Sequence, residues 1–311
     1  MNWVLLRIGP PLAAMRGVVG NRGLRRAQLG FLAFSAAESA TWVAILVYAY
    51  DRGGTSETGL VGLLLLVPAG IVAPVAAALG DRYRRERLLL VGYAVQTLAA
   101  AATAASILLG LAAPIVYGLA IVSMASMTTS RPALHSLVPN LARTPDEVTA
   151  GNSVSSLAEG LGGTLGTAAV SGLLVLWGPG VAYAVMAGVL AIAAVMMVGV
   201  HSQRTGIVVG GLRPWSLAIE TFEGLATIAR SPGPRLLVAI AGLLTITWGA
   251  FDVLLVTIAI DVLAIGDGGV GVLQTAAGVG ASQVRPARSR LSGDVPWYLR
   301  SSVRRCCWAR R

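Results

Sequence analysis

The sequence predicts an all-α fold, a polytopic bundle of transmembrane helices, and two observations carry this prediction. Hydrophobic residues make up 55% of the chain and charged residues only 12%, with a mean hydropathy of +0.74, whereas a soluble domain carries about 25% charged residues. The uncharged run 58–79 is 22 residues long, and as a helix it crosses a hydrocarbon core of about 30 Å. Such runs are far longer than the strands of a membrane barrel.

Seven spans of this kind follow one another along the chain. The first ends in aromatic residues, Trp42 and Tyr50 among them, which are typical of a membrane interface. Residues 177–180 (WGPG) make the turn between spans five and six, and Asp146 and Glu147 are placed to start the fifth helix, since acids stabilise a helix N-terminus. The predicted spans are Ala27–Tyr50, Thr58–Leu79, Leu88–Leu109, Pro114–Ser130, Ala150–Trp177, Gly180–Val200 and Leu236–Ile260.

The spans predict a division of the chain into five segments. An eighth apolar run starts at Gly268 but is rich in glycine and meets Arg285, so its ability to cross the membrane is marginal. Trp215 and Phe222 lie on one face of an expected interfacial amphipathic helix. The segments are an N-terminal arm (1–26), a six-helix bundle (27–200), a connector with the interfacial helix (201–235), the start of a second transmembrane repeat (236–281) and a basic tail (282–311).

The distribution of arginine predicts the orientation in the membrane. All 24 basic residues are arginines, and 23 of them lie in the N-terminal arm, the tail and alternate loops. The remaining loops hold only Arg52, beside Asp51, Glu57, Asp261 and Asp267. Because short basic loops stay in the cytoplasm, we expect a multi-pass protein of a bacterial cytoplasmic membrane with a cytoplasmic N-terminus. The net charge of +10 therefore orients the chain and indicates no nucleic-acid partner.

The loop between spans two and three carries a resemblance to a known family. Residues 77–87 read AALGDRYRRER, which resembles the signature G-x-L-A-D-R-x-G-R-R of the major facilitator superfamily. The closest likeness is to its macrolide-efflux-like, drug-exporting branch, which residues 131–141 (RPALHSLVPNL) also resemble. In the family this loop holds the cytoplasmic gate, and the resemblance therefore implies a gate-loop motif here, made of Gly80, Asp81, Arg82, Arg84 and Arg85.

A glycine-rich stretch in span five has two interpretations. Gly160, Gly163 and Gly166 permit close helix packing. The surrounding EGLGGTLGTAAVSGLL also resembles the antiporter motif of exporters, although Thr167 stands where that motif has proline. The R-x-x-Q-G motif of span four is absent.

A weak internal repeat supports the same family. Asp51 and Glu57 recur 210 residues later as Asp261 and Asp267, as expected for two parallel six-helix halves. Family members have twelve spans, so the resemblance implies a member truncated after about the eighth helix. The composition changes at Ser282, and the tail is interpreted either as out-of-frame sequence or as a regulatory segment that binds anionic lipid.

Three acids inside predicted spans are candidates for a proton or substrate site. Glu38 lies near the middle of span one, Asp252 in the outer half of span seven, and Glu159 a third of the way into span five. Each costs about 2.5–3.5 kcal/mol to insert, which makes a functional role a default hypothesis. The alternative is a structural carboxylate bonded to hydroxyl or backbone groups. No arginine is expected inside a span to pair with any of them.

The sequence favours a transporter over an enzyme. It contains no nucleophile–base set, phosphate loop or metal-ligand spacing, and the two cysteines, Cys306 and Cys307, are adjacent. We therefore expect no cofactor and no metal. The resemblance implies a secondary active transporter that exports small amphipathic compounds against protons by alternating access, with membrane lipid, substrate and protons as its partners. The alternatives are a truncated remnant that transports nothing and a membrane scaffold subunit.

Overall fold

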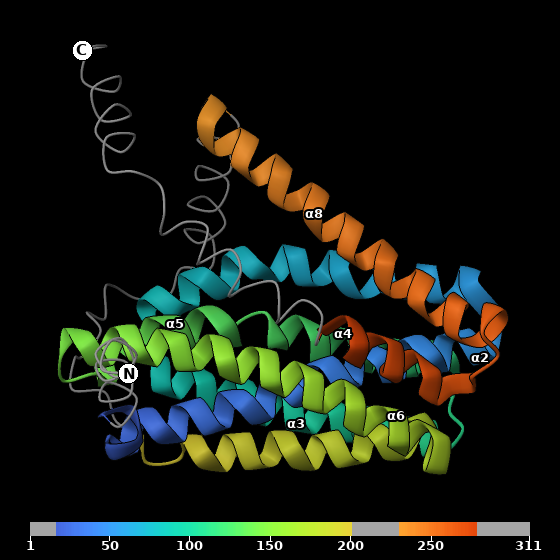
Figure 1. Ribbon diagram of the computed structural model, residues 1–311, viewed down its shortest axis with the longest axis horizontal. Coiled ribbons are helices and arrows are strands. Elements are labelled where there is room, and N and C mark those ends of the chain that lie inside the picture. Colours follow the sequence, from blue (N-terminus) through green and yellow to red (C-terminus); the bar gives the residue numbers. More distant parts are fainter. Residues whose placement is uncertain (1–16, 201–229, 279–311) are drawn as a thin grey trace, which may run out of the picture.

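A computed structural model describes residues 17–200 and 230–278, and for residues 71 and 73–82 it describes the backbone alone. Within these ranges the chain is helical and contains no strand (Figure 1). This confirms the predicted all-α fold. The elements are α2 (Arg22–Arg82), α3 (Arg85–Leu108), α4 (Ala113–Met127), α5 (Ser130–Leu141), α6 (Pro145–Met197), α8 (Pro232–Thr257), the π-helix η1 (Ile258–Val262) and a last helix over 266–278.

Five helical stretches in the described part of the chain are long and apolar enough to cross a membrane. The longest two are each divided by glycine. Gly53 and Gly54 leave helical geometry inside α2, and Gly178, with φ 77°, does so inside α6. Positive φ is accessible to glycine at little cost, so these residues form hairpin turns. Predicted spans one and two therefore both lie in α2, and predicted spans five and six both lie in α6, which ends at Met197.

The end of the fourth predicted span differs from the structure. Span four was expected to end at Ser130 and to give way to a polar connection, but α5 begins there and continues to Leu141. Pro132 stands in the first turn of α5, where the missing N–H costs nothing. Leu134 and Leu137 bury one face of α5, so the segment is an amphipathic helix. At its other end the connection closes with Thr144, whose hydroxyl caps α6.

The eighth apolar run is helical from residue 266 to 278 and packs against α6. Its glycines allow this contact, because a Cβ added to Gly271 would lie 2.6 Å from the carbonyl oxygen of Thr167. The hydroxyl groups of Thr167 and Thr275 are 2.9 Å apart and hydrogen-bonded. Thr167 therefore joins α6 to the helix over 266–278.

The first half of α2 forms the centre of the bundle, with α6 packed closely against it. A Cβ added to Gly162 would lie 2.7 Å from the carbonyl oxygen of Leu32, and one added to Gly166 would lie 2.8 Å from the Cα of Ala36. Four residues separate the two glycines, which places them on one helix face. A Cβ added to Gly160 would meet nothing within 4 Å, and one added to Gly163 would lie 3.3 Å from the Ser39 hydroxyl oxygen, so of the three glycines singled out in the sequence Gly166 makes the closest approach.

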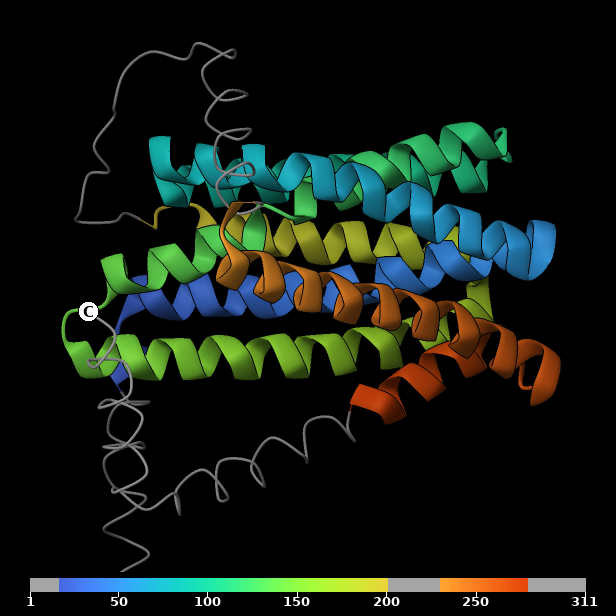
Figure 2. The same ribbon diagram turned by 90° about the horizontal axis from the view of Figure 1, so that it is seen from above.

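The remaining helix, α8, crosses α2 obliquely (Figures 1 and 2). Its last part is buried against the bundle at Leu255 and Val256. Its first part rises away from the bundle, and Leu237 and Ile246 are each 70% exposed. We call the end of the bundle that carries Arg22, Arg84 and Arg143 the arginine-rich end, and the end that carries Asp51, Glu57, Asp261 and Asp267 the acidic end. The first part of α8 lies towards the arginine-rich end, and its last part lies at the acidic end.

Candidate functional site

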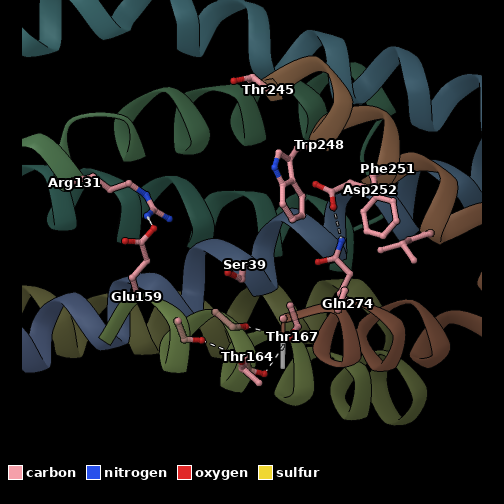
Figure 3. A pocket seen from close by; sticks show the side chains of 15 residues that line it. Ser39, Arg131, Glu159, Thr164, Thr167, Thr245, Trp248, Phe251, Asp252 and Gln274 are labelled. Carbon is pink, nitrogen blue, oxygen red and sulfur yellow. Dashed lines mark hydrogen bonds and ion pairs between the residues drawn. The ribbon is translucent and has the colours of Figure 1, made fainter. Parts of the chain in front are cut away.

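Two adjoining cavities lie between α8 and the other helices. Their volumes are about 810 and 630 Å³, within the range of small-molecule sites. They adjoin each other because six residues line both, and Figure 3 shows the lining of the larger one. The shared residues are Ser39, Arg131, Thr245, Trp248, Asp252 and Gln274.

Arg131 forms a bridge between two of the predicted acids in this space. Its Nη2 lies 2.5 Å from Oε2 of Glu38, and its Nη1 is paired with Oε1 of Glu159. We call these three residues the triad. They come from α5, α2 and α6, so one guanidinium joins three helices. The expectation that no arginine would pair with the acids was wrong. It placed Arg131 at the end of span four, whereas the helical path continues through α5.

The triad has a net charge of −1 when both carboxylates are ionised. An arginine between two acids offsets part of the cost of placing charge inside a membrane. Adding one proton to Glu38 or Glu159 makes the triad neutral and removes one of its two ion pairs. The geometry can therefore couple proton binding to the contact of α5 with α2 or α6.

Asp252, the third predicted acid, lines both cavities but is held differently. Its carboxylate accepts one hydrogen bond from the Trp42 indole Nε1, at 3.0 Å, and one from the Gln274 amide Nε2, at 3.1 Å. Both donors are neutral. The three residues come from α2, α8 and the helix over 266–278, so Asp252 connects the first half of the chain with both helices that follow the connector. Trp42 and Asp252 are 210 residues apart, the period of the internal repeat.

At the acidic end, side-chain contacts hold α8 and η1 against α2. The Tyr50 hydroxyl donates to Asp261, and the hydroxyl groups of Thr55 and Thr257 are 3.3 Å apart. Within the described residues, the side-chain hydrogen bonds between α2 and the α8–η1 segment lie at Asp252 or beyond it, and the first part of α8 is exposed. Among the described residues, these contacts therefore bound the cavity towards the acidic end, and no side-chain hydrogen bond joins α2 to the first part of α8 towards the arginine-rich end.

Two carboxyl groups, those of Asp51 and Asp267, interact electrostatically near the hairpin turn of α2 at this end. Partial burial raises the pKa of Asp51 to about 6, and the nearby negative charge of Asp267 acts in the same direction. A proton on Asp51 removes this repulsion. Stability of the contacts at the acidic end is therefore expected to depend on pH around this value.

The gate-loop residues lie at the arginine-rich end. The Arg85 guanidinium donates to the Ser136 carbonyl oxygen at 3.0 Å, which joins α3 to α5. Arg84 pairs with buried Glu86, with Nη2 and Oε1 2.6 Å apart. Gly80, Asp81 and Arg82 form the last turn of α2, and only their backbone is described. The arm up to residue 16, the interfacial helix predicted around Trp215 and the tail from residue 279 onwards lie outside the described residues.

Sequence reasoning missed Arg131, Trp42 and Gln274 as partners of the acids, and Trp248 and Phe251 as cavity residues. A signal for Arg131 was present, since buried positions 134, 137 and 138 in α5 follow a helical period. The contacts of Asp252 carry no local signal, because they join residues that are 22 and 210 positions apart.

Comparison with known proteins identifies a family for the chain. The family model described as Major Facilitator Superfamily matches residues 28–302, which is most of the sequence. A search of curated proteins finds no match. The matched region contains the cavity, the triad, Asp252 and the gate loop.

Proposed function

The chain belongs to the major facilitator superfamily of membrane transporters, and we propose that it exports small amphipathic compounds in exchange for protons by alternating access. The observation that carries this proposal is the triad. It places two acids and one arginine from three helices in a cavity of substrate size. The protein would act in the cytoplasmic membrane of a bacterium.

The arginine distribution supports the direction of transport. By the positive-inside rule, the short loops at the arginine-rich end favour a cytoplasmic position for this end. An opening on this side would receive substrate from inside the cell, while the contacts of Tyr50 with Asp261 and of Thr55 with Thr257 join the helices at the opposite end. This conformation fits the loading step of an exporter.

Protonation of the triad supplies the coupling step. When Glu38 accepts a proton, its pairing with Arg131 is weakened, and Glu159 is then the only carboxylate paired with the guanidinium. The helices α2 and α5 then lose a charged contact, and the balance between two conformations shifts by the energy of that contact. The gate-loop residues Arg84 and Arg85, together with Asp81, are proposed to control the cytoplasmic end during this change.

The experiment is proton-coupled transport by the full chain in proteoliposomes. Substrate-induced proton movement is measured for wild type and for Glu38→Gln, with Asp146→Asn as a matched control, since Asp146 is exposed at the start of α6 and distant from the cavity. We expect Glu38→Gln to abolish proton movement and the control to retain it. Unchanged proton movement in Glu38→Gln would exclude that residue as the carrier.

A second candidate is a remnant that inserts into the membrane but transports nothing, and the exposure of α8 between Leu237 and Ile246 favours it. The family match, however, continues to residue 302, beyond the change in composition at residue 282, which favours the transporter. Translating the coding sequence after codon 281 in the other two frames separates the candidates. Four further apolar spans in one frame would support the remnant.

A further inference from the structure

The cavity has more negative charge than its own residues compensate. Among the described lining residues, Glu38, Glu159 and Asp252 are acidic and Arg131 is the only basic residue. Arg131 forms ion pairs with Glu38 and Glu159. Asp252 is left with hydrogen bonds from neutral donors, and a carboxylate inside a membrane is strongly stabilised by a positive partner. A ligand that enters this space can supply that missing charge.

Aromatic side chains flank Asp252 on its own helix. Trp248 and Phe251 precede it by four and one residues, and their rings meet edge to face with centroids 6.1 Å apart. Both line the larger cavity, and Trp248 is 60% exposed. Figure 3 shows the two rings beside the Asp252 carboxylate. Aromatic faces attract cations, most strongly when the cation is desolvated.

We propose that Asp252, Trp248 and Phe251 form a binding site for a monovalent organic cation with an apolar or aromatic body, separate from the triad. The carboxylate would supply the charge and the rings would contact the apolar body. A metal ion fits this site poorly, because the described residues contain no group of three metal-ligating side chains. This inference rests on the proposed function in one respect, namely that the bound cation is the exported compound.

The test compares two ions of the same shape and opposite charge. Binding of tetraphenylphosphonium and of tetraphenylborate to the full chain in detergent is measured by equilibrium dialysis. Wild type is expected to bind the phosphonium ion and to show no saturable binding of the borate ion. Asp252→Asn should weaken phosphonium binding by about tenfold or more, as for loss of a charge-assisted contact. Asp146→Asn, which removes the same charge outside the cavity, should bind like wild type.

The aromatic contribution is tested with two variants at position 248. Trp248→Ala should weaken phosphonium binding about threefold to tenfold, whereas Trp248→Phe should restore most of the affinity. This pair also decides the question if Asp252→Asn does not fold. Equal affinity in wild type and Asp252→Asn, equal affinity in all three forms at position 248, or equal binding of both ions by wild type would each overturn the site.

The outcome separates the site from the proposed function. Binding that depends on Asp252 with no proton-coupled transport by wild type would support the site and refute the exporter. Transport that depends on Glu38 with binding insensitive to Asp252 would refute the site and leave the exporter standing.

Discussion

Replacing Arg131 with glutamine tests the energetic role of the triad, because it leaves two carboxylates in the cavity with no positive partner. Removing one member of a fully buried pair costs about 3–5 kcal/mol, and an exposed pair contributes about 0–1 kcal/mol. The side chains of Arg131 and Glu159 are 38% and 39% exposed and that of Glu38 is 22% exposed. The expected loss lies between the two limits, at about 2 kcal/mol.

The matched comparison is Glu38→Gln, which leaves Arg131 paired with Glu159 and makes the site neutral. This variant should lose less than about 1 kcal/mol. Thermal unfolding of the purified full chain measures the difference. At about 2–4 °C per kcal/mol for a chain of this size, Arg131→Gln should melt about 4–8 °C below wild type and Glu38→Gln close to it. Equal melting temperatures for the two variants would show that the bridge contributes nothing to stability.

Two further predictions concern packing and pH. Gly166→Ala should lower the melting temperature by several degrees, because the added Cβ would lie 2.8 Å from the Cα of Ala36. Gly160→Ala should leave the melting temperature unchanged, since its Cβ would meet nothing within 4 Å. Equal melting temperatures for the two variants would contradict the assignment of the packed face. Asp51, with its pKa raised to about 6, favours the protonated form when folded, so wild type should become less stable as pH rises from 5 to 7.5. Asp51→Asn should reduce that slope in thermal unfolding, and an identical slope would show that Asp51 does not contribute.

Hydropathy predicts the helices of this protein well and their ends poorly. The uncharged runs must be helical, since a membrane leaves no other way to satisfy the backbone, and the glycines at 53, 54 and 178 make the turns between them. By hydropathy, the charged residue Arg131 followed by Pro132 indicates that the fourth helix ends there. The structure nevertheless continues as α5, because buried residues such as Leu134 and Leu137 stabilise a helix whose opposite face is polar.

The candidate site shows a second limit of sequence reasoning. An acid within an apolar run is recognisable from sequence, and Glu38, Glu159 and Asp252 were all identified in this way. Their partners are set by tertiary contacts, such as the pairing of Arg131 with Glu38 over 93 positions. The glycines of α6 show the same limit. Their spacing in the sequence does not tell which face of α6 is packed, and the contact of Gly166 with Ala36 in α2 shows it.

The triad and Asp252 act on different contacts, and this difference gives the proposed exchange a physical basis. The triad joins helices of the first half, so a proton there loosens α5 from α2 or α6. Asp252 joins the first half to α8 through Trp42 and to the last helix through Gln274. A cation that binds the Asp252 carboxylate competes with the Trp42 and Gln274 donors and weakens the interhelical contacts near the acidic end. Because a ligand shifts a conformational balance only through its differential affinity, the proton and the cation would each favour a conformation by breaking a different set of interhelical bonds.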